Sequence, residues 1–292
     1  MLLILGALWG ASFMFIKVGD RELHPITLVG FRMALGALTL VPIVLISVGA
    51  RRTVRELRRA ACPLIVTGLL NSAIPIFAIT WAETRLDSGL TAIIQASAPL
   101  FTALLALRFS LDERVRGWRL AGLVVGFAGV ALLVGGRPGG QIPAALAVVF
   151  SALCYAAAAL YAGRRLRATP PLVTALGTLI AATLATLPVA LFQLPGHMTG
   201  WKVTASVLTL GIAGTGLAYI LYYGLISGAG ASRAILITYL VPTFAVVYGA
   251  VLLGEPVTAA AIGGLALVLV GVGLGTGAIR LGRPRRLAST ET

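Results

Sequence analysis

Charged residues are scarce in this chain. Asp, Glu, Lys and Arg make up only 11% of its 292 residues, with nine acidic and 23 basic side chains. A soluble domain of this length needs a large charged surface, so the shortage excludes an ordinary soluble fold. Because the arginines lie between long apolar runs and not on one polar face, the basic excess does not indicate nucleic-acid binding either.

Residues that commonly carry out chemistry are few as well. The two cysteines, Cys62 and Cys154, stand in apolar runs without CxxC spacing, and we expect both to be small buried residues. Both histidines, His24 and His197, fall in predicted loops. The sequence contains no HExxH, GxSxG or P-loop motif and no dinucleotide-binding fingerprint that follows a predicted strand. It therefore predicts no catalytic residue, no metal site and no cofactor, and the protein is not expected to be an enzyme.

Apolar sequence is what the chain has in abundance, with 59% hydrophobic residues and a mean hydropathy of +0.99. A helix that crosses the hydrocarbon of a membrane needs about 20 mostly apolar residues. Ten segments meet this requirement: 2–18, 26–46, 62–82, 89–109, 118–135, 142–162, 172–193, 203–224, 232–253 and 258–279. The predicted fold class is an all-α polytopic membrane protein with ten transmembrane helices.

The basic residues predict how these helices are oriented. Residues 51–60 read RRTVRELRRA, with five arginines in nine residues between the second and third spans. Lys and Arg in short loops favour the cytoplasmic side. With the amino terminus inside, seventeen basic residues fall on the inner side and five on the outer side, and Arg32 lies within a span. We therefore predict a cytoplasmic (inner) membrane protein with both termini in the cytoplasm, and we interpret 51–59 as an orienting loop that can also contact anionic lipid.

Two parts of the chain resemble each other. SAPLFTALLALRFSLDE (97–113) aligns with LVPTFAVVYGAVLLGE (240–255), which pairs Pro99 with Pro242 and Glu113 with Glu255. Glycines and a further proline recur in the same order on either side. Each half holds five spans, and because five is odd the second half must be inverted relative to the first. The predicted units are a first repeat, 1–140, a second repeat, 141–280, and a basic cytoplasmic tail, 281–292.

These features resemble a known family. Two five-span repeats, each with a proline, an apolar stretch, a glutamate and a glycine-rich last span, are similar to the drug/metabolite transporter superfamily, EamA type. The opening LWGASFMFIK and the spacing from Pro25 to Arg32 resemble that family's first repeat. The resemblance implies ten helices around a central cavity, alternating access, and movement of small metabolites, often outward. Gly177 stands where the first repeat has Arg32, so any role of that arginine is not duplicated.

Polar side chains within apolar spans are the candidate site residues, because they are costly in hydrocarbon unless they are paired or face a cavity. Gln95 and Thr238 each stand four residues before a repeat-related proline, and Tyr219 and Tyr222 share a helix face that excludes Tyr223. The alternative role of these residues is to join packed helices. The predicted substrate-binding set is Trp9, Ser12, Asn71, Gln95, Pro99, Tyr219, Tyr222, Thr238 and Pro242.

Charged groups are expected to lie away from the membrane midplane. All nine acidic residues fall at span ends, in loops or in the tail, which argues against proton coupling through a midplane carboxylate. We expect Arg32 to reach the outer headgroups or to brace a loop, with a bidentate contact to a substrate carboxylate as the alternative. Glu113 and Glu255 are expected to cap the following helix or to pair with an arginine.

The predicted function is alternating-access transport of small neutral, zwitterionic or amphipathic metabolites, such as amino acids, most simply outward. The alternative is a structural or regulatory membrane protein with a closed, packed core. The expected partners are a small-molecule substrate and the lipid bilayer, without nucleic acid. The sequence leaves open whether the protein is a monomer or a homodimer.

The orientation can be measured with single cysteines introduced after Cys62 and Cys154 are replaced by alanine. A membrane-impermeant thiol reagent added outside should modify Gly139→Cys and His197→Cys and spare Val54→Cys and Pro284→Cys, because the arginine bias places the second pair inside. The reverse labelling pattern would overturn the predicted orientation.

Overall fold

The computed structural model describes residues 1–109, 118–135, 139–229 and 236–276. Several residues used above lie outside these ranges. They are Glu113, the nearby Arg114 and Arg116, Arg137, Arg233 and the predicted tail 281–292 with Pro284.

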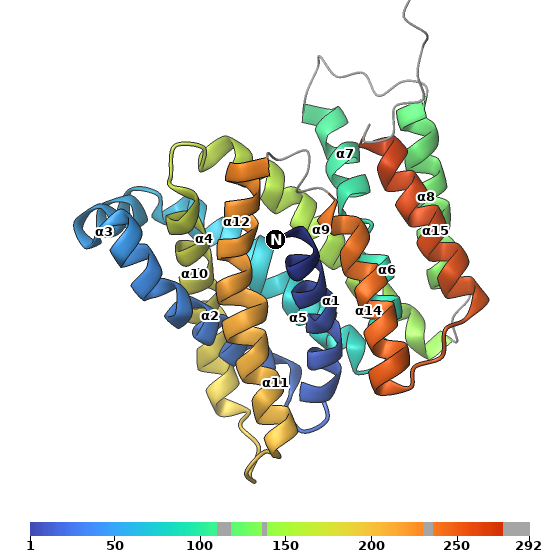
Figure 1. Cartoon of the computed structure of the whole chain (residues 1–292), viewed down its shortest axis with the longest axis horizontal. Coiled ribbons are helices and arrows are strands. Elements are labelled where there is room, and N and C mark those ends of the chain that lie inside the picture. Colours follow the sequence, from blue (N-terminus) through green and yellow to red (C-terminus); the bar gives the residue numbers. More distant parts are fainter. Residues whose placement is uncertain (110–117, 136–138, 230–235, 277–292) are drawn as a thin grey trace, which may run out of the picture.

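Every regular element in these ranges is a helix (Figure 1). The first predicted repeat contains α1 (Leu2–Gly19), α2 (Pro25–Val48), α3 (Ala50–Arg59), α4 (Ala61–Gly68), η1 (Leu69–Ala73), α5 (Ile74–Glu83), α6 (Ser88–Gln95), α7 (Ala98–Phe109), α8 (Trp118–Gly135) and η2 (Gly139–Gln141). The second contains α9 (Ile142–Arg165), α10 (Pro171–Phe192), α11 (Trp201–Gly211), η3 (Ile212–Leu217), α12 (Ala218–Ala229), α14 (Ile237–Leu253) and α15 (Ala259–Gly275).

These elements form ten apolar segments. Eight are long and apolar enough to cross a membrane, and α14 and α15 are shorter apolar helices. Each predicted span overlaps one of the ten segments. The prediction of an all-α, ten-helix membrane protein is confirmed.

Proline acts differently at the two repeat-related positions. In the fourth segment, α6 ends at Gln95 and α7 begins at Ala98, with Pro99 in its first turn. This placement costs little, because the first turn of a helix has no intrahelical partner for its N–H groups. Pro242 instead lies inside the continuous helix α14. The two positions correspond in sequence, but their local backbone differs.

Hydrogen bonds join the interhelical connections at one end of the bundle, the lower end in Figure 1. The carboxylate of Glu22 accepts from the Gly200 amide at 2.7 Å, which links the α1–α2 connection to the α10–α11 connection. The Lys17 ammonium donates to the carbonyls of Glu83 and Leu86 at 2.6 and 2.8 Å. We call this the Asp20 end, after the residue that follows α1.

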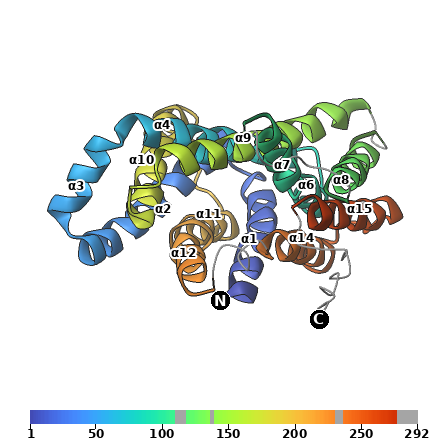
Figure 2. The ribbon, with the colours of Figure 1, turned by 90° about the horizontal axis from the view of Figure 1, so that it is seen from above.

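Contacts between helices are paired between the two halves. Helix α2 packs against α10, and α8 packs against α15, at opposite sides of the bundle (Figure 2). Helix α1 of the first half contacts α14, and correspondingly α9 contacts α6 and α7. Likewise, α5 contacts α9, and α1 contacts α11. The two π-helices also correspond, since η1 follows Gly68 and η3 follows Gly211. Each contact therefore has a counterpart in which every helix is replaced by the equivalent helix of the other half, as expected for two similar halves. The boundaries 1–140 and 141–280 stay a prediction.

Glycines allow α8 and α15 to approach closely. A Cβ atom on Gly271 would lie 2.3 Å from the Cα of Gly126, and one on Gly122 would lie 2.5 Å from the amide nitrogen of Gly275. Backbone atoms cannot swing aside as a flexible side chain can, so these positions have no room for a larger residue. Small residues are common where transmembrane helices pack closely.

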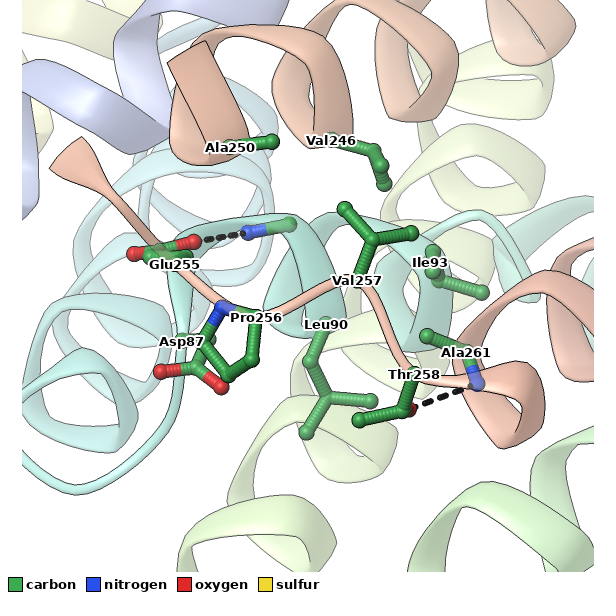
Figure 3. Close-up of a pocket in the computed structure, with 11 residues that line it drawn as sticks. Asp87, Leu90, Ile93, Val246, Ala250, Glu255, Pro256, Val257, Thr258 and Ala261 are labelled. Atoms are coloured by element: carbon green, nitrogen blue, oxygen red, sulfur yellow. Dashed lines mark hydrogen bonds between the residues drawn. The ribbon is translucent and has the colours of Figure 1, made fainter. Parts of the chain in front are cut away.

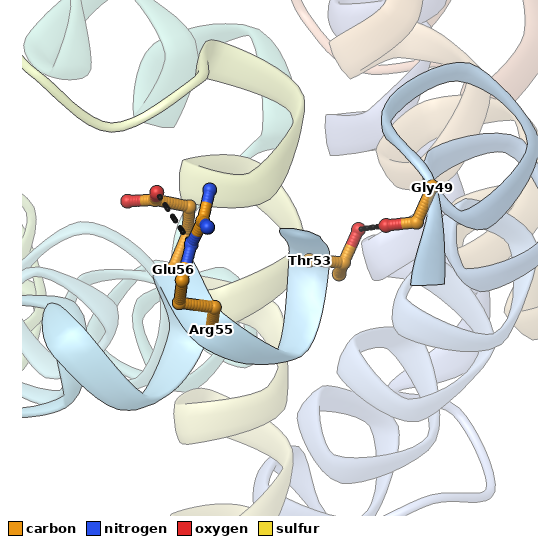
Figure 4. Close-up of polar contacts among 4 residues, drawn as sticks. All are labelled: Gly49, Thr53, Arg55 and Glu56. Atoms are coloured by element: carbon orange, nitrogen blue, oxygen red, sulfur yellow. Dashed lines mark hydrogen bonds and ion pairs between the residues drawn. The ribbon is translucent and has the colours of Figure 1, made fainter. Parts of the chain in front are cut away.

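The basic segment 51–59 is helical, which corrects its interpretation as a loop. Helix α3 lies at the edge of the bundle (Figure 2), follows Gly49 at a φ of 88°, and exposes all five of its arginines. Its inner face buries Thr53 and Glu56. The Thr53 hydroxyl donates to the Gly49 carbonyl at 2.9 Å, and Arg55 Nε lies 3.7 Å from Glu56 Oε1 (Figure 4). This arrangement is that of a surface helix whose exposed side is strongly basic.

The cysteine prediction is half correct. Cys154 is buried in α9, but Cys62 is exposed in the first turn of α4. An apolar run predicts membrane insertion without saying which of its faces turns to lipid, and Cys62 lies on the outward face.

The glycine contact between α8 and α15 predicts a position-specific loss of stability. Gly271→Ala should destabilise the protein by about 1–3 kcal/mol, because its Cβ forces two backbones apart. Gly263→Ala on the same helix is the matched control, since no atom lies within 4 Å of its added Cβ. We expect the unfolding temperature of the purified protein to fall only for Gly271→Ala, and equal effects of the two changes would refute the packing argument.

Candidate functional site

Aromatic side chains of α1 and α12 form a cluster. The ring centroids of Trp9 and Tyr222 lie 5.4 Å apart, and those of Tyr222 and Tyr223 lie 5.5 Å apart. Tyr219 stacks on Tyr223 at 6.2 Å with an interplanar angle of 18°. All four side chains are half-buried. Tyr223 contacts both other tyrosines, because residues three to four apart are neighbours on a helix surface; which of the three rings faces a substrate stays a prediction.

The first π-helix adds an amide to this cluster. Asn71 lies within η1, and its Nδ2 donates to the Tyr219 hydroxyl at 3.2 Å. A π-turn widens the helix locally and often marks a functional site. The structure therefore brings together four of the predicted site residues, Trp9, Asn71, Tyr219 and Tyr222, from α1, η1 and α12.

The second π-helix, η3, forms a hydrogen bond with Arg32 of α2. The Arg32 Nε donates to the Thr215 hydroxyl in η3 at 3.0 Å, and the same hydroxyl donates to the Leu210 carbonyl at 2.8 Å. The Arg32 guanidinium also lies close enough to Tyr155, Tyr219 and Glu83 to interact with each electrostatically. With an exposed fraction of 7%, Arg32 does not reach the outer headgroups, so the favoured expectation for it is wrong.

Packing explains why Arg32 points inward. Gly211 lets α11 pass directly over α2, where a Cβ atom would lie 2.4 Å from Leu35 and 3.3 Å from the Arg32 carbonyl. Gly36 has a similar contact with Thr215 at 2.7 Å. The sequence shows these glycines but not which helix they contact. The Gly-rich segment around Thr215 was the signal that could have identified it as a partner of Arg32.

The other predicted residues lie on α1, α6, α7 and α14, and the hydrogen bonds of Gln95 and Ser12 go to residues outside this cluster. The Gln95 Oε1 accepts from Ser151 Oγ at 3.0 Å, which joins α6 to α9. Thr238 and Pro99 are half-buried, and Pro242 is buried. Ser12 is 5% exposed, and its hydroxyl donates to the Leu8 carbonyl at 3.1 Å. Ser151 was missed because one serine in an apolar run has no distinguishing neighbour.

A small pocket lies at the Asp20 end between α6 and the α14–α15 connection (Figure 3). Its volume of about 30 Å³ suits one or two water molecules and not a metabolite. None of the predicted site residues lines it. Its lining residues include Asp87, Leu90, Ile93, Glu255 and Val257.

Glu255 at this pocket caps a helix from the other half of the chain. Its carboxylate accepts from the Ser88 amide at 2.8 Å, the Ser88 hydroxyl at 2.9 Å and the Gly89 amide at 3.1 Å. The capped helix is α6, whereas α15, the following helix, is capped by Thr258, which accepts from the Ala261 amide at 3.1 Å. A carboxylate is favourable at a helix amino terminus. Glu255 is thus a cap, as predicted, but for a different helix.

Comparisons with known proteins agree with this arrangement. The model of the EamA-like transporter family matches residues 1–135 and 142–276. An uncharacterized inner membrane transporter of Escherichia coli is 26% identical over 258 residues, covering 85% of this chain and 80% of the relative. A probable terminal-alkyne amino-acid exporter of Streptantibioticus cattleyicolor is 29% identical over 294 residues, covering 97% and 93%. A solved crystal structure covers 95% of this chain and 96% of its own, with a TM-score of 0.66 at 20% identity, which shows a shared fold.

The cap at α6 predicts a graded loss of stability. Glu255→Ala removes three hydrogen bonds to a charged acceptor and should lower the free energy of unfolding by at least about 1.5–3 kcal/mol. Ser88→Ala removes only the hydroxyl donor and should cost about 1 kcal/mol. Thermal unfolding of both variants checks this order, and a Ser88→Ala loss as large as that of Glu255→Ala would contradict the role of the carboxylate.

Proposed function

Because the chain belongs to the EamA-like transporter family, we propose that it exports small metabolites from the cytoplasm by alternating access. The proposed substrates are neutral, zwitterionic or amphipathic solutes, with amino acids as the leading class. The family match supports a transporter, and the proposal assigns no catalytic role to any residue. Both termini face the cytoplasm in this proposal, and the Asp20 end faces outward.

The observation that carries the proposal is the polar and aromatic cluster at the two π-helices. Three helical segments, α1, η1 with α5, and η3 with α12, meet there and contribute an indole, an amide and phenol rings. Tyrosine and tryptophan provide apolar surface with a polar atom at the edge, which suits an amphipathic solute. Intramembrane sites of transporters are typically built where helices are interrupted.

Arg32 supplies the positive charge for an amino-acid carboxylate. Its Nε is bonded to Thr215, and a guanidinium has further N–H donors that can hold a carboxylate in a bidentate contact. Tyr155 and Tyr219 lie near the same guanidinium. We assign the carboxylate to Arg32 and the side chain of the substrate to the ring cluster of Trp9, Tyr219 and Tyr222.

The two halves of the chain give this site its transport role. The family model matches twice, and the helices that line the cluster come from both matched segments. Rocking of one unit against the other would expose the cluster to each side in turn. A closed, packed core, the alternative, would use the same polar groups only to hold helices together.

Transport in proteoliposomes tests the proposal. Radiolabelled neutral amino acids preloaded inside should exchange with external amino acid faster than in protein-free vesicles. Failure of a panel of neutral, aromatic and amphipathic amino acids to exchange would refute the proposed substrate class.

Gln95→Leu separates a substrate contact from a structural bond. If Gln95 binds substrate, its replacement should weaken apparent affinity about two- to tenfold. Ser151→Ala is the matched control, because it removes the interhelical hydrogen bond and leaves the Gln95 amide in place. The apparent KM and the unfolding temperature are measured for both. A loss of stability of about 0.6 kcal/mol that is the same in both variants, with KM unchanged, would assign Gln95 to packing.

A further inference from the structure

Glu83 is the most deeply buried acidic group in the described ranges. It ends α5, its exposed fraction is 0%, and neither carboxylate oxygen has a hydrogen-bond partner. An ionised carboxylate without partners and without water is very costly, so a group in this position takes up a proton instead. The sequence places Glu83 in a polar turn, ETRLDS, and for that reason it was not a candidate.

The nearest cation does not neutralise Glu83. Lys17 directs its ammonium to the backbone carbonyls of Glu83 and Leu86, at the carboxyl end of α5. Cations are favourable at such helix ends, and this contact leaves the Glu83 carboxylate itself without an ion pair. Arg32 bonds to Thr215 through Nε and reaches Glu83 only through a longer-range electrostatic interaction.

A second buried carboxyl lies beside it. Both carboxylate oxygens of Asp20 are buried without a partner, at the end of α1. Burial raises the pKa of Asp20 to about 8, and the nearby charge of Lys17 opposes this shift. Asp20 and Glu83 interact with each other across the contact between α1 and α5. Two like charges that interact in this way disfavour ionisation of both groups at once.

Charged groups from several helices surround Glu83. The charged or titratable groups are Lys17 and Asp20 from α1, Arg32 from α2 and Glu255 from the α14–α15 connection. Arg32 in turn interacts electrostatically with Tyr155 of α9 and Tyr219 of α12. The two cations and the acidic groups therefore interact around one buried site at the Asp20 end, and Arg32 connects this site to the aromatic cluster.

We propose that Glu83 and Asp20 form a proton-binding site that must be occupied for the Asp20 end of the transporter to close. With the site protonated, the two carboxyls are neutral and can remain buried as observed. Loss of a proton to water on that side leaves a charge that is stable only when hydrated, which favours the open state. If the protein transports solutes as proposed above, protons on the outer side control its transport cycle, and this consequence rests on the proposed function.

Accessibility measurements test this without a substrate. Ser12→Cys, in a background with Cys62 and Cys154 replaced by alanine, places a buried thiol on α1 next to the cluster. A membrane-impermeant reagent added at the Asp20 end should modify it faster as the pH rises, by up to about tenfold per pH unit. Rates are divided by those of His197→Cys, which is exposed at the same end, to remove the pH dependence of the thiol itself.

Glu83→Gln provides the decisive comparison, because glutamine has the shape of the protonated acid and cannot ionise. Its normalised labelling rate should be low and should change less than about twofold over the same pH range. Glu22→Gln is the matched control, with an exposed carboxylate in the adjacent connection, and should retain the response of the parent protein. A parent protein without a pH response, or a response that survives in Glu83→Gln, would overturn the proposal.

Thermal stability gives a second readout in case Glu83→Gln folds poorly. The pKa of Asp20 is about 8 in the folded protein, against an ordinary value of 3.8. Its contribution to stability is fully present below pH 3.8 and is lost as the pH rises toward 8. The unfolding temperature should therefore fall between pH 5 and 8.5, and Asp20→Asn should flatten that fall. An unchanged slope in Asp20→Asn would count against the site.

Transport distinguishes this proposal from the proposed function. In proteoliposomes, lowering the pH at the Asp20 end should change the exchange rate of the parent protein and leave that of Glu83→Gln constant. Absence of exchange together with intact pH-dependent labelling would refute the substrate proposal alone. Exchange that responds to a sodium gradient and not to pH would refute the proton site alone.

Discussion

The hydrocarbon core of a membrane offers no water to a polar group, so most buried polar groups of a membrane-spanning bundle find their partners within the protein. This constraint organises the structure. Within the spans, backbone groups are bonded in helices, and several side-chain groups are gathered where helices meet. Arg32 bonds to Thr215, Asn71 to Tyr219 and Gln95 to Ser151. Each of these bonds joins different transmembrane segments, so the polar groups also set which helices are neighbours.

Glu83 and Asp20 are the exceptions to this rule among the acidic residues that the structure describes. Their carboxylate oxygens are buried without hydrogen-bond partners, beside an ammonium that is bonded to backbone carbonyls. A carboxyl group can satisfy the constraint in another way, by accepting a proton. The same lack of water that makes the ring cluster suitable for an amphipathic solute would therefore make this end of the bundle sensitive to pH.

Two related halves do not have to be chemically equal. The π-helices η1 and η3 stand at matching places, but η1 presents an amide to a tyrosine and η3 presents a hydroxyl to Arg32. Gly177 occupies the position that matches Arg32, where a Cβ atom would lie 2.7 Å from Leu64. At this pair of positions the first half thus provides a positive charge, and the second half provides close helix packing. In the proposed transport cycle, a single cationic position is enough for a single carboxylate.

The sequence by itself determined the class of the protein, its ten spans and the correspondence of its halves. These features depend on composition and on the order of prolines and glycines, which are properties of the chain alone. Trp9, Asn71, Tyr219 and Tyr222 could be selected from it because a polar or aromatic group in hydrocarbon stands out wherever the helix turns. Tertiary structure alone decided that Arg32 points inward, that Glu255 caps α6 and that Glu83 is sealed from water. Each of these depends on which helix approaches at a glycine or at a helix end, and that contact is set by three-dimensional packing between segments far apart in the chain.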